Sequence, residues 1–234
     1  MIWDSEVFRQ YLFDARIVQA AGVTIAVATG AQIGATVLGF IVALGARARS
    51  RAFNLIAFGY TWLFRGMPPL IQLLLLYFGL PALGIRLSVL EAGVIGLTLS
   101  AAAYMAGIVR AALESIDRGQ VEAARSLGFS RAMTMRTILL PQAIRVILPP
   151  FGNEFMSMMR TTSLLSVISF EELLRVTTLA INETFRPLEL YSVAALYYLA
   201  MTTAWMLIQQ QLEKHYAIRG SNRQVVPTAL TNPG

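Results

Sequence analysis

Long apolar segments are the feature that most constrains the fold of this chain. Each is close to, or longer than, the roughly 20 residues that an α-helix needs to cross about 30 Å of hydrocarbon. The sequence therefore predicts an all-α integral membrane protein with about five transmembrane helices, of which the fourth has the weakest signal. The five segments cover residues 18–46, 53–80, 88–113, 146–168 and 188–212.

The composition indicates one polytopic membrane domain. Of the 234 residues, 56% are hydrophobic and only 14% are charged, which is more apolar than a small soluble core requires. We expect the transmembrane domain to span residues 18–217, after an extracytoplasmic segment, 1–17. A disordered cytoplasmic tail, 218–234, is expected to follow it. The sequence shows no repeat at a fixed period and no second soluble domain.

The basic residues indicate how the chain is oriented in the membrane. If the amino terminus lies outside the cytoplasm and the carboxyl terminus inside, the cytoplasmic segments carry most of the 19 Lys and Arg residues, as the positive-inside rule requires. The net charge of +6 could also suggest nucleic acid, but the basic residues form no stripe interleaved with aromatic residues. We therefore expect a lipid bilayer, and no nucleic acid, as a partner.

A polar loop between the third and fourth apolar segments, at about residues 114–141, is too long for an ordinary connection between packed helices. Asp117, or Ser115 before it, can cap a helix that Gly128 would end. Ser130 can cap a second short helix, and Pro141 is expected to end that helix because it removes a backbone donor. The loop therefore predicts a helix, a turn and a second helix.

One face of the first loop helix has little side-chain bulk. Val121, Ala124, Leu127 and Gly128 fall three or four residues apart, so another protein could approach the helix closely. The alternative is an amphipathic hairpin that lies on lipid headgroups. From the residue pattern alone, both interpretations stay open.

The loop resembles the EAA motif in the membrane subunits of bacterial ATP-binding-cassette (ABC) importers. The matching residues are Glu122, Ala123, Ala124, Gly128, Ile138, Leu140 and Pro141. The resemblance covers roughly residues 20–215, because further segments are similar to signatures of the polar amino-acid subfamily. These segments are Arg65 to Gln72, Tyr77 to Pro81, Gly119-Gln120, Pro141-Gln142-Ala143, Thr162-Ser163-Leu164 and Thr184-Phe185-Arg186-Pro187.

This resemblance implies the type I ABC importer fold, in which the loop is a coupling helix that fits a groove on an ABC ATPase subunit. It also implies a second permease subunit, the same or related, and a periplasmic solute-binding protein that delivers a polar amino acid or a derivative. The implied location is the bacterial inner membrane. An ion-coupled secondary carrier or channel, with the loop lying on lipid, is the alternative of a different class.

The sequence predicts no enzymatic activity and no cofactor in the chain itself. ATP hydrolysis would need a glycine-rich phosphate loop ending in lysine, and the only lysine, Lys214, has no such loop before it. ATP and Mg²⁺ would therefore be bound by a partner ATPase. The only histidine is His215 and there is no cysteine, so neither a histidine-based triad nor a multi-histidine metal centre can be built.

Arg160 is a candidate for the substrate pathway because it lies within the fourth apolar segment. An unpaired charge there costs on the order of 2.5 to 3.5 kcal/mol, so Arg160 must face protein, water or a partner. With Thr162 and Ser163 it could bind a substrate carboxylate. Alternatively, Arg160 pairs with Glu154 or with helix-end carbonyls and only stabilises the bundle. Arg65, beside a Gly-Met-Pro-Pro break, has the same ambiguity.

Gly107 lies where the resembling family often has glutamate. Loss of an acidic group would make the pathway less suited to a cationic side chain and locally wider. This departure favours a neutral or acidic amino acid, or a bulkier derivative, as the substrate.

Glu171 and Glu172 lie in the outer loop between the last two apolar segments. Consecutive helical side chains diverge, so the pair is not expected to act together as an acid pair. We expect both to be solvated, with contact to an external binding protein as their possible function.

Overall fold

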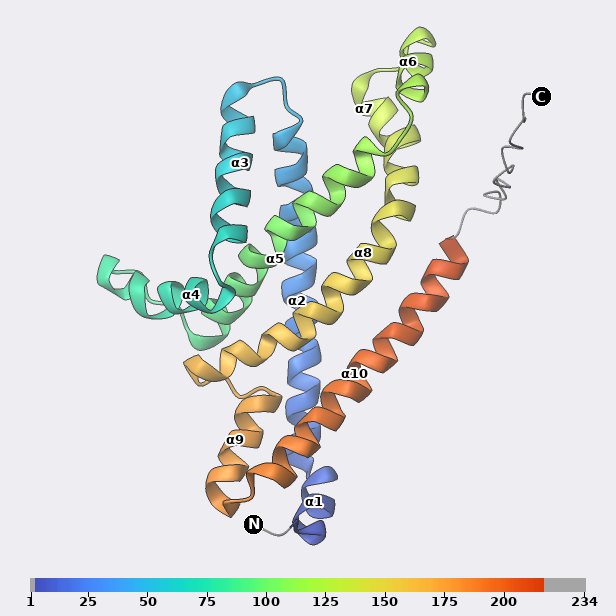
Figure 1. The fold of residues 1–234 in the computed structure, drawn as a ribbon. Coiled ribbons are helices and arrows are strands. Elements are labelled where there is room, and N and C mark those ends of the chain that lie inside the picture. Colours follow the sequence, from blue (N-terminus) through green and yellow to red (C-terminus); the bar gives the residue numbers. More distant parts are fainter. Residues whose placement is uncertain (1–2, 217–234) are drawn as a thin grey trace, which may run out of the picture.

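The computed structural model describes residues 3–216, and all the regular structure in that range is helical (Figure 1). The predicted all-α fold is confirmed, whereas the expected tail, 218–234, lies outside the described residues. In chain order the elements are α1 (Ser5–Leu12), α2 (Ala15–Ala46), α3 (Arg51–Gly66), α4 (Pro69–Leu74), a π-helix (Leu75–Gly79), a 3-10 helix (Leu80–Leu83), α5 (Val89–Glu114), α6 (Arg118–Ser126), α7 (Arg131–Thr134), a second π-helix (Met135–Leu139), α8 (Leu140–Thr161), a second 3-10 helix (Thr162–Ile168), α9 (Leu173–Thr184) and α10 (Pro187–Tyr216).

Three helices in the described part of the chain, α2, α5 and α10, are long and apolar enough to cross a membrane. They match the predicted first, third and fifth segments. The predicted second segment is not straight: α3 and the residues Pro69–Leu83 are bent by 105° relative to each other, and counting this pair as one span gives four. Pro68 and Pro69 explain the bend, because neither has an amide hydrogen and Pro68 forces Met67 into an extended conformation.

The predicted fourth segment, 146–168, comprises the C-terminal part of α8 and the 3-10 helix that follows it. It is not among the candidate spans. Pro149 and Pro150 lie inside α8, which packs against α5 and α10. From α10, the Trp205 indole donates to the Gly152 carbonyl at 2.9 Å and the Gln209 amide donates to the Pro149 carbonyl at 3.2 Å. Helix α10 therefore binds α8 directly at its proline pair.

The most extensive contact in the fold joins α2 and α5. Small residues line it, with Ala28, Ala31 and Ala35 of α2 completely buried. A side chain at Gly39 would place its Cβ 2.6 Å from the Met105 Cβ, so only glycine allows this approach of the two helices. Glycine and alanine therefore serve as packing residues between α2 and α5.

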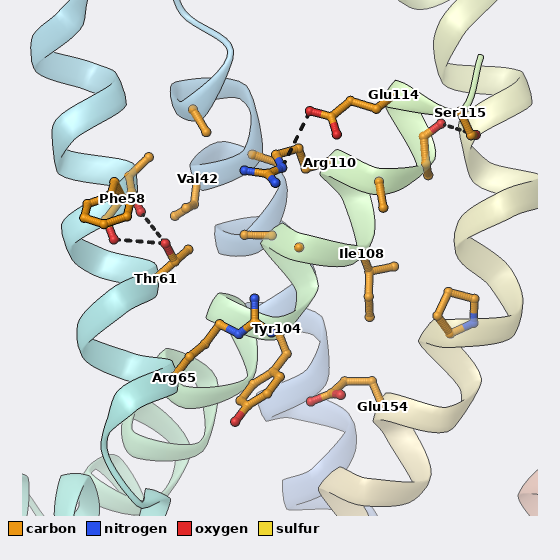
Figure 2. A pocket seen from close by; sticks show the side chains of 18 of the residues that line it. Val42, Phe58, Thr61, Arg65, Tyr104, Ile108, Arg110, Glu114, Ser115 and Glu154 are labelled. Carbon is orange, nitrogen blue, oxygen red and sulfur yellow. Dashed lines mark hydrogen bonds and ion pairs between the residues drawn. The ribbon is translucent and has the colours of Figure 1, made fainter. Parts of the chain in front are cut away.

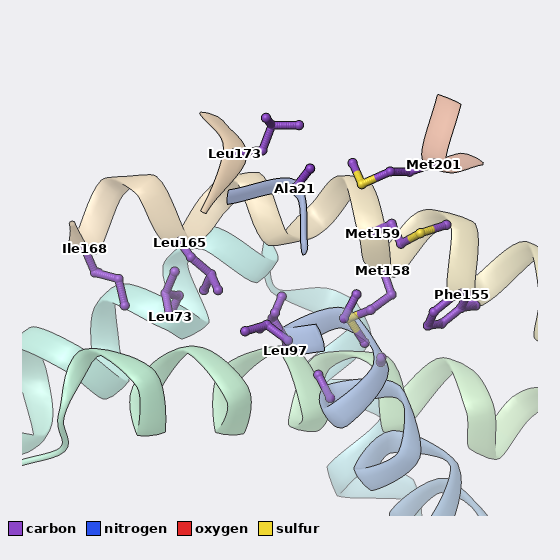
Figure 3. Close-up of a cluster of buried hydrophobic side chains, with 14 of the residues drawn as sticks. Ala21, Leu73, Leu97, Phe155, Met158, Met159, Leu165, Ile168, Leu173 and Met201 are labelled. Atoms are coloured by element: carbon purple, nitrogen blue, oxygen red, sulfur yellow. The ribbon is translucent and has the colours of Figure 1, made fainter. Parts of the chain in front are cut away.

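The arm formed by α4 and the helical turns after it projects sideways from the bundle (Figure 1). Its inner side packs on α5, and Leu73 and Leu97 belong to one buried cluster that also contains Leu165 and Ile168 (Figure 3). Gly96 of α5 faces the arm as well, because a Cβ there would lie 3.3 Å from Leu76 and 3.5 Å from Leu73. The arm and α5 therefore pack as one unit.

The two ends of the bundle differ. Helices α6 and α7 lie at one end, and α1 and α9 lie at the opposite end (Figure 1). At the α9 end the expectation of a solvated Glu172 is wrong: the residue is completely buried, while Glu171 is exposed. Glu172 caps α9 by accepting from the Leu174 and Arg175 amides at 2.9 and 2.8 Å, and the Tyr198 hydroxyl donates to it at 3.0 Å. Burial raises the pKa of Glu172, and these hydrogen bonds oppose the rise.

We expect Gly39→Ala to destabilise the protein, because the new Cβ would overlap the Met105 side chain and the backbone of α5. Overpacking of this kind costs about 1 to 3 kcal/mol. Gly30→Ala is the matched control on the same helix, since nothing lies within 4 Å of its added Cβ. Thermal unfolding of the purified protein in detergent measures both. Equal melting temperatures for the two variants would contradict the close approach of α2 and α5.

Candidate functional site

The loop between α5 and α8 folds as its capping residues predict. The Asp117 carboxylate accepts from the Gly119 amide at 2.9 Å and starts α6. Gly128 ends the helix with a left-handed φ of 78°, and the Phe129 amide returns to the Ala124 carbonyl at 3.0 Å. The Ser130 hydroxyl then accepts from the Met133 amide at 3.2 Å and caps α7. The predicted helix, turn and helix are confirmed.

The prediction that Pro141 ends the second loop helix is wrong. Helix α7 passes through the π-helix Met135–Leu139 into α8, and Pro141 lies in the first turn of α8. In this wider turn the Leu140 amide donates to the Met135 carbonyl five residues back. A π-turn lets the chain continue as a helix beside a residue that has no amide hydrogen. Leu80 and Pro81 repeat the arrangement after the first π-helix.

The structure also corrects which face of α6 is free. Ala124 is 2% exposed, and Val121 packs on a buried cluster that includes Leu139. The small-residue face predicted from spacing is therefore partly occupied by the chain itself. Glu122 and Ala123 are exposed and Leu127 is 76% exposed, so these residues form the open side of the loop.

A glutamine pair ties α6 to α8. The Gln142 amide donates to the Gln120 side-chain oxygen at 2.6 Å and to the Ile138 carbonyl at 2.9 Å, while Ala143 beside it is completely buried. This pair and the unbroken helix through Leu140 connect α6 to α8. Ile138 and Leu140 of the motif are half-buried within this connection.

A cavity of about 930 Å³ lies between α2, α3, α5 and α8 (Figure 2). Arg65 of α3 and Glu154 of α8 lie on opposite sides of Tyr104 of α5, and the Arg65 guanidinium carbon is 5.3 Å from the centre of the Tyr104 ring. A Cβ at Gly107 would lie 3.6 Å from the Arg65 guanidinium. The structure therefore brings Arg65 and Gly107 together, as two of the predicted pathway residues.

The cavity extends from this group toward the α6 end of the bundle, where Arg110 and Glu114 form an ion pair of 3.6 Å. On the other side, Tyr104 and Glu154 also line a smaller cavity of about 230 Å³, which reaches Thr161. These two side chains stand where the cavities meet. The sequence patterns do not single out Tyr104, and they indicate Glu154 only as a partner for Arg160. The spacing of Tyr104 and Gly107, three residues apart on one helix, could have identified the shared face.

The three other predicted pathway residues do not converge on this cavity. Arg160 is exposed, and the ion pairs within residues 3–216 include none between it and Glu154. The two residues are six positions apart on α8 and so lie on different faces. Thr162 is completely buried, and its hydroxyl donates to the Met159 carbonyl at 2.7 Å. The Ser163 hydroxyl donates to the Arg160 carbonyl at 2.7 Å.

Residues 35–218 match the family described as "Binding-protein-dependent transport system inner membrane component". The chain is 39% identical to the arginine transport system permease protein ArgU of Corynebacterium glutamicum, over 97% of this chain and 76% of that protein. It is 32% identical to the histidine/lysine/arginine/ornithine transport system permease protein HisQ of Escherichia coli, over 89% of this chain and 96% of HisQ. It is 40% identical to the octopine transport system permease protein OccM of Rhizobium meliloti, over 71% of each chain.

Solved structures agree with these relatives. The fold is similar to a chain in the crystal structure of an amino acid ABC transporter with histidines, with a TM-score of 0.85, 34% identity, and coverage of 92% of this chain and 100% of that one. A chain of the MetNI methionine ABC transporter in an inward-facing conformation matches with a TM-score of 0.72 at 18% identity, covering 86% of this chain and 95% of that one. The second match supports the fold alone.

We expect Gly128→Ala to loosen the loop, because a side chain in the left-handed region costs about 1 to 2 kcal/mol. Gly119→Ala on the same helix is the control, since its added Cβ makes only ordinary contacts with Asp117. Hydrogen exchange of the α6 amides should be faster in Gly128→Ala and close to wild type in Gly119→Ala. Identical exchange in both variants would contradict the role of the Gly128 turn.

Proposed function

The chain belongs to the family of inner membrane components of binding-protein-dependent transport systems, and we propose that two such subunits, the same or related, enclose one substrate pathway. The chain is a permease subunit of an ABC importer for polar amino acids. The family implies ATPase and binding-protein partners and a location in the inner membrane. In the proposed assembly, ATPase subunits bind ATP and Mg²⁺ at the α6 end, and a periplasmic binding protein delivers the substrate to the α9 end. The amino terminus then lies in the periplasm and the end of α10 in the cytoplasm.

One observation carries this proposal: the two helices joined by the loop form two of the four walls of the cavity. Tyr104 and Gly107 lie on α5, which leads into the loop, and Glu154 lies on α8, which leaves it. A force applied to the open side of α6, at Glu122, Ala123 and Leu127, would therefore move two walls of the cavity together. Such a rigid-body displacement of helices is a recurring mechanism for opening a site to alternate sides.

The cavity offers opposite charges for an amino acid, which carries both a carboxylate and an ammonium group. In the proposed pathway the Arg65 guanidinium attracts the carboxylate, and Glu154 attracts the ammonium group. Arg160, with Thr162 and Ser163, remains a second proposed contact. Because Arg160 is exposed on this subunit, its role there depends on a second subunit that covers it.

The alternative function is an ion-coupled carrier or channel in which the loop only lies on lipid. Such proteins usually hold ionisable relays within several spans. Two features of the loop support the importer instead: Ala124 and Val121 face the chain rather than lipid, and Gln142 binds the loop to α8. A loop attached in this way is suited to transmitting force from a partner.

The decisive experiment is co-purification of an ATPase subunit with the tagged chain, followed by uptake into vesicles with and without ATP. Ala123→Arg would place a large cation on the open side of α6, so we expect it to abolish both co-purification and ATP-dependent uptake. Gln10→Arg, also at an exposed helical site but at the opposite end, should leave co-purification unchanged. Uptake by the wild type that follows an ion gradient and ignores ATP would favour the carrier.

A second experiment tests the cavity. Gly107→Glu would place a carboxylate beside the Arg65 guanidinium and neutralise it, so that cationic substrates are no longer repelled. We expect the ratio of arginine to glutamine uptake to rise roughly tenfold, the effect of about 1.4 kcal/mol. Gly107→Gln has the same size without the charge and is the control. An equal change of ratio in both variants would show that size, and not charge, decides.

A further inference from the structure

The α9 end of the bundle has a groove that the pathway does not use. It has a volume of about 340 Å³ and lies between the start of α2 and α9. Val23, Val176 and Leu179 provide apolar walls, while Arg16, Glu171 and Glu183 bring charge to it. Protein–protein interfaces commonly have an apolar centre surrounded by a polar rim, and this groove has the same arrangement.

Phe185 comes two residues after Glu183, which lines this groove, and is unusual in two ways. It follows α9 in the left-handed conformation, with φ of 56°, which is uncommon for a bulky residue. Its side chain is also 76% exposed. The Phe185 amide donates to the Ile181 carbonyl at 2.7 Å, and Arg186 forms an ion pair of 3.5 Å with Asp4, so the turn is held in place. A strained and exposed aromatic side chain in a fixed turn suits a contact that another molecule supplies.

The charge of the groove indicates what kind of molecule would bind there. Arg16 is the only basic side chain on the groove, and it is already paired with Asp14 at 3.3 Å and with Glu183 at 3.4 Å. Glu171 is exposed and is, with Glu183, one of two carboxylates that line the groove against one basic side chain. The groove therefore has an excess of negative charge, which attracts a basic surface and disfavours anionic lipid headgroups. The charged residues on both sides of Phe185 also place the turn at the level of water rather than hydrocarbon.

We propose that this groove and Phe185 form the docking surface for the binding protein, which contacts it through a Lys- or Arg-bearing surface and receives Phe185 in an apolar pocket. The inference rests on the proposed function, because it needs a binding protein at the α9 end. It adds the location of the contact on this chain and the sign of the charge on the partner.

The test uses the complete transporter in lipid nanodiscs, with its binding protein added at increasing concentration. The readout is the binding-protein concentration that gives half-maximal stimulation of ATP hydrolysis. The double variant Glu171→Lys and Glu183→Lys should raise this concentration about tenfold or more, and high salt should raise it in the wild type. Glu6→Lys, an exposed acidic site on α1 outside the groove, should change it by less than about twofold. Basal ATP hydrolysis should be unchanged in all variants.

Phe185→Gly separates docking from folding. Glycine relieves the left-handed strain, so the variant should melt no lower than wild type, yet loss of the ring should raise the half-maximal concentration about fivefold or more. Phe185→Tyr should behave like wild type. Unchanged half-maximal concentrations in the lysine and glycine variants, with a wild type that is stimulated, would overturn the docking surface alone. A wild type that no binding protein stimulates would overturn the importer proposal, and the inference with it.

Discussion

The contact between α2 and α5 is the constraint on which the other parts of the structure depend. Lipid gives helices no hydrophobic reason to associate, so they must gain stability from close van der Waals packing. Ala28, Ala31 and Ala35 are completely buried in α2, and Gly39 touches α5 where a Cβ would not fit. Once α5 is fixed in this way, Tyr104 and Gly107 face Arg65 across the cavity.

Proline residues determine where the helices of this chain bend and where they continue. Pro68 and Pro69 turn the chain away from α3 by 105°, whereas Pro141 is accommodated after a π-turn and leaves α7 and α8 continuous. The Pro149-Pro150 pair then falls where Trp205 and Gln209 of α10 bind α8. Proline thus ends one helix and is accommodated within another, because Met67 before Pro68 is extended whereas a π-turn precedes Pro141.

Local patterns predicted the loop well, and distant contacts account for the errors. Asp117, Gly128 and Ser130 act within three or four residues of their partners, so the sequence was enough to place α6 and the start of α7. Glu172 was expected in solvent, but it is buried and accepts a hydrogen bond from Tyr198, which lies 26 residues later in the chain. Ala124 was expected on the open side of α6, but the chain covers it.

The sequence by itself determined the helical membrane fold, the capped helices of the loop between α5 and α8, and the family, since these follow from apolar length, local hydrogen bonds and motif spacing. Tertiary structure decided which charged residues share a space. Arg65, Gly107 and Glu154 come from three helices and line one cavity, whereas Arg160 and Ser163, neighbours in sequence, do not join them. The reason is that side-chain direction around a helix axis gains meaning only when the neighbouring helices are in place.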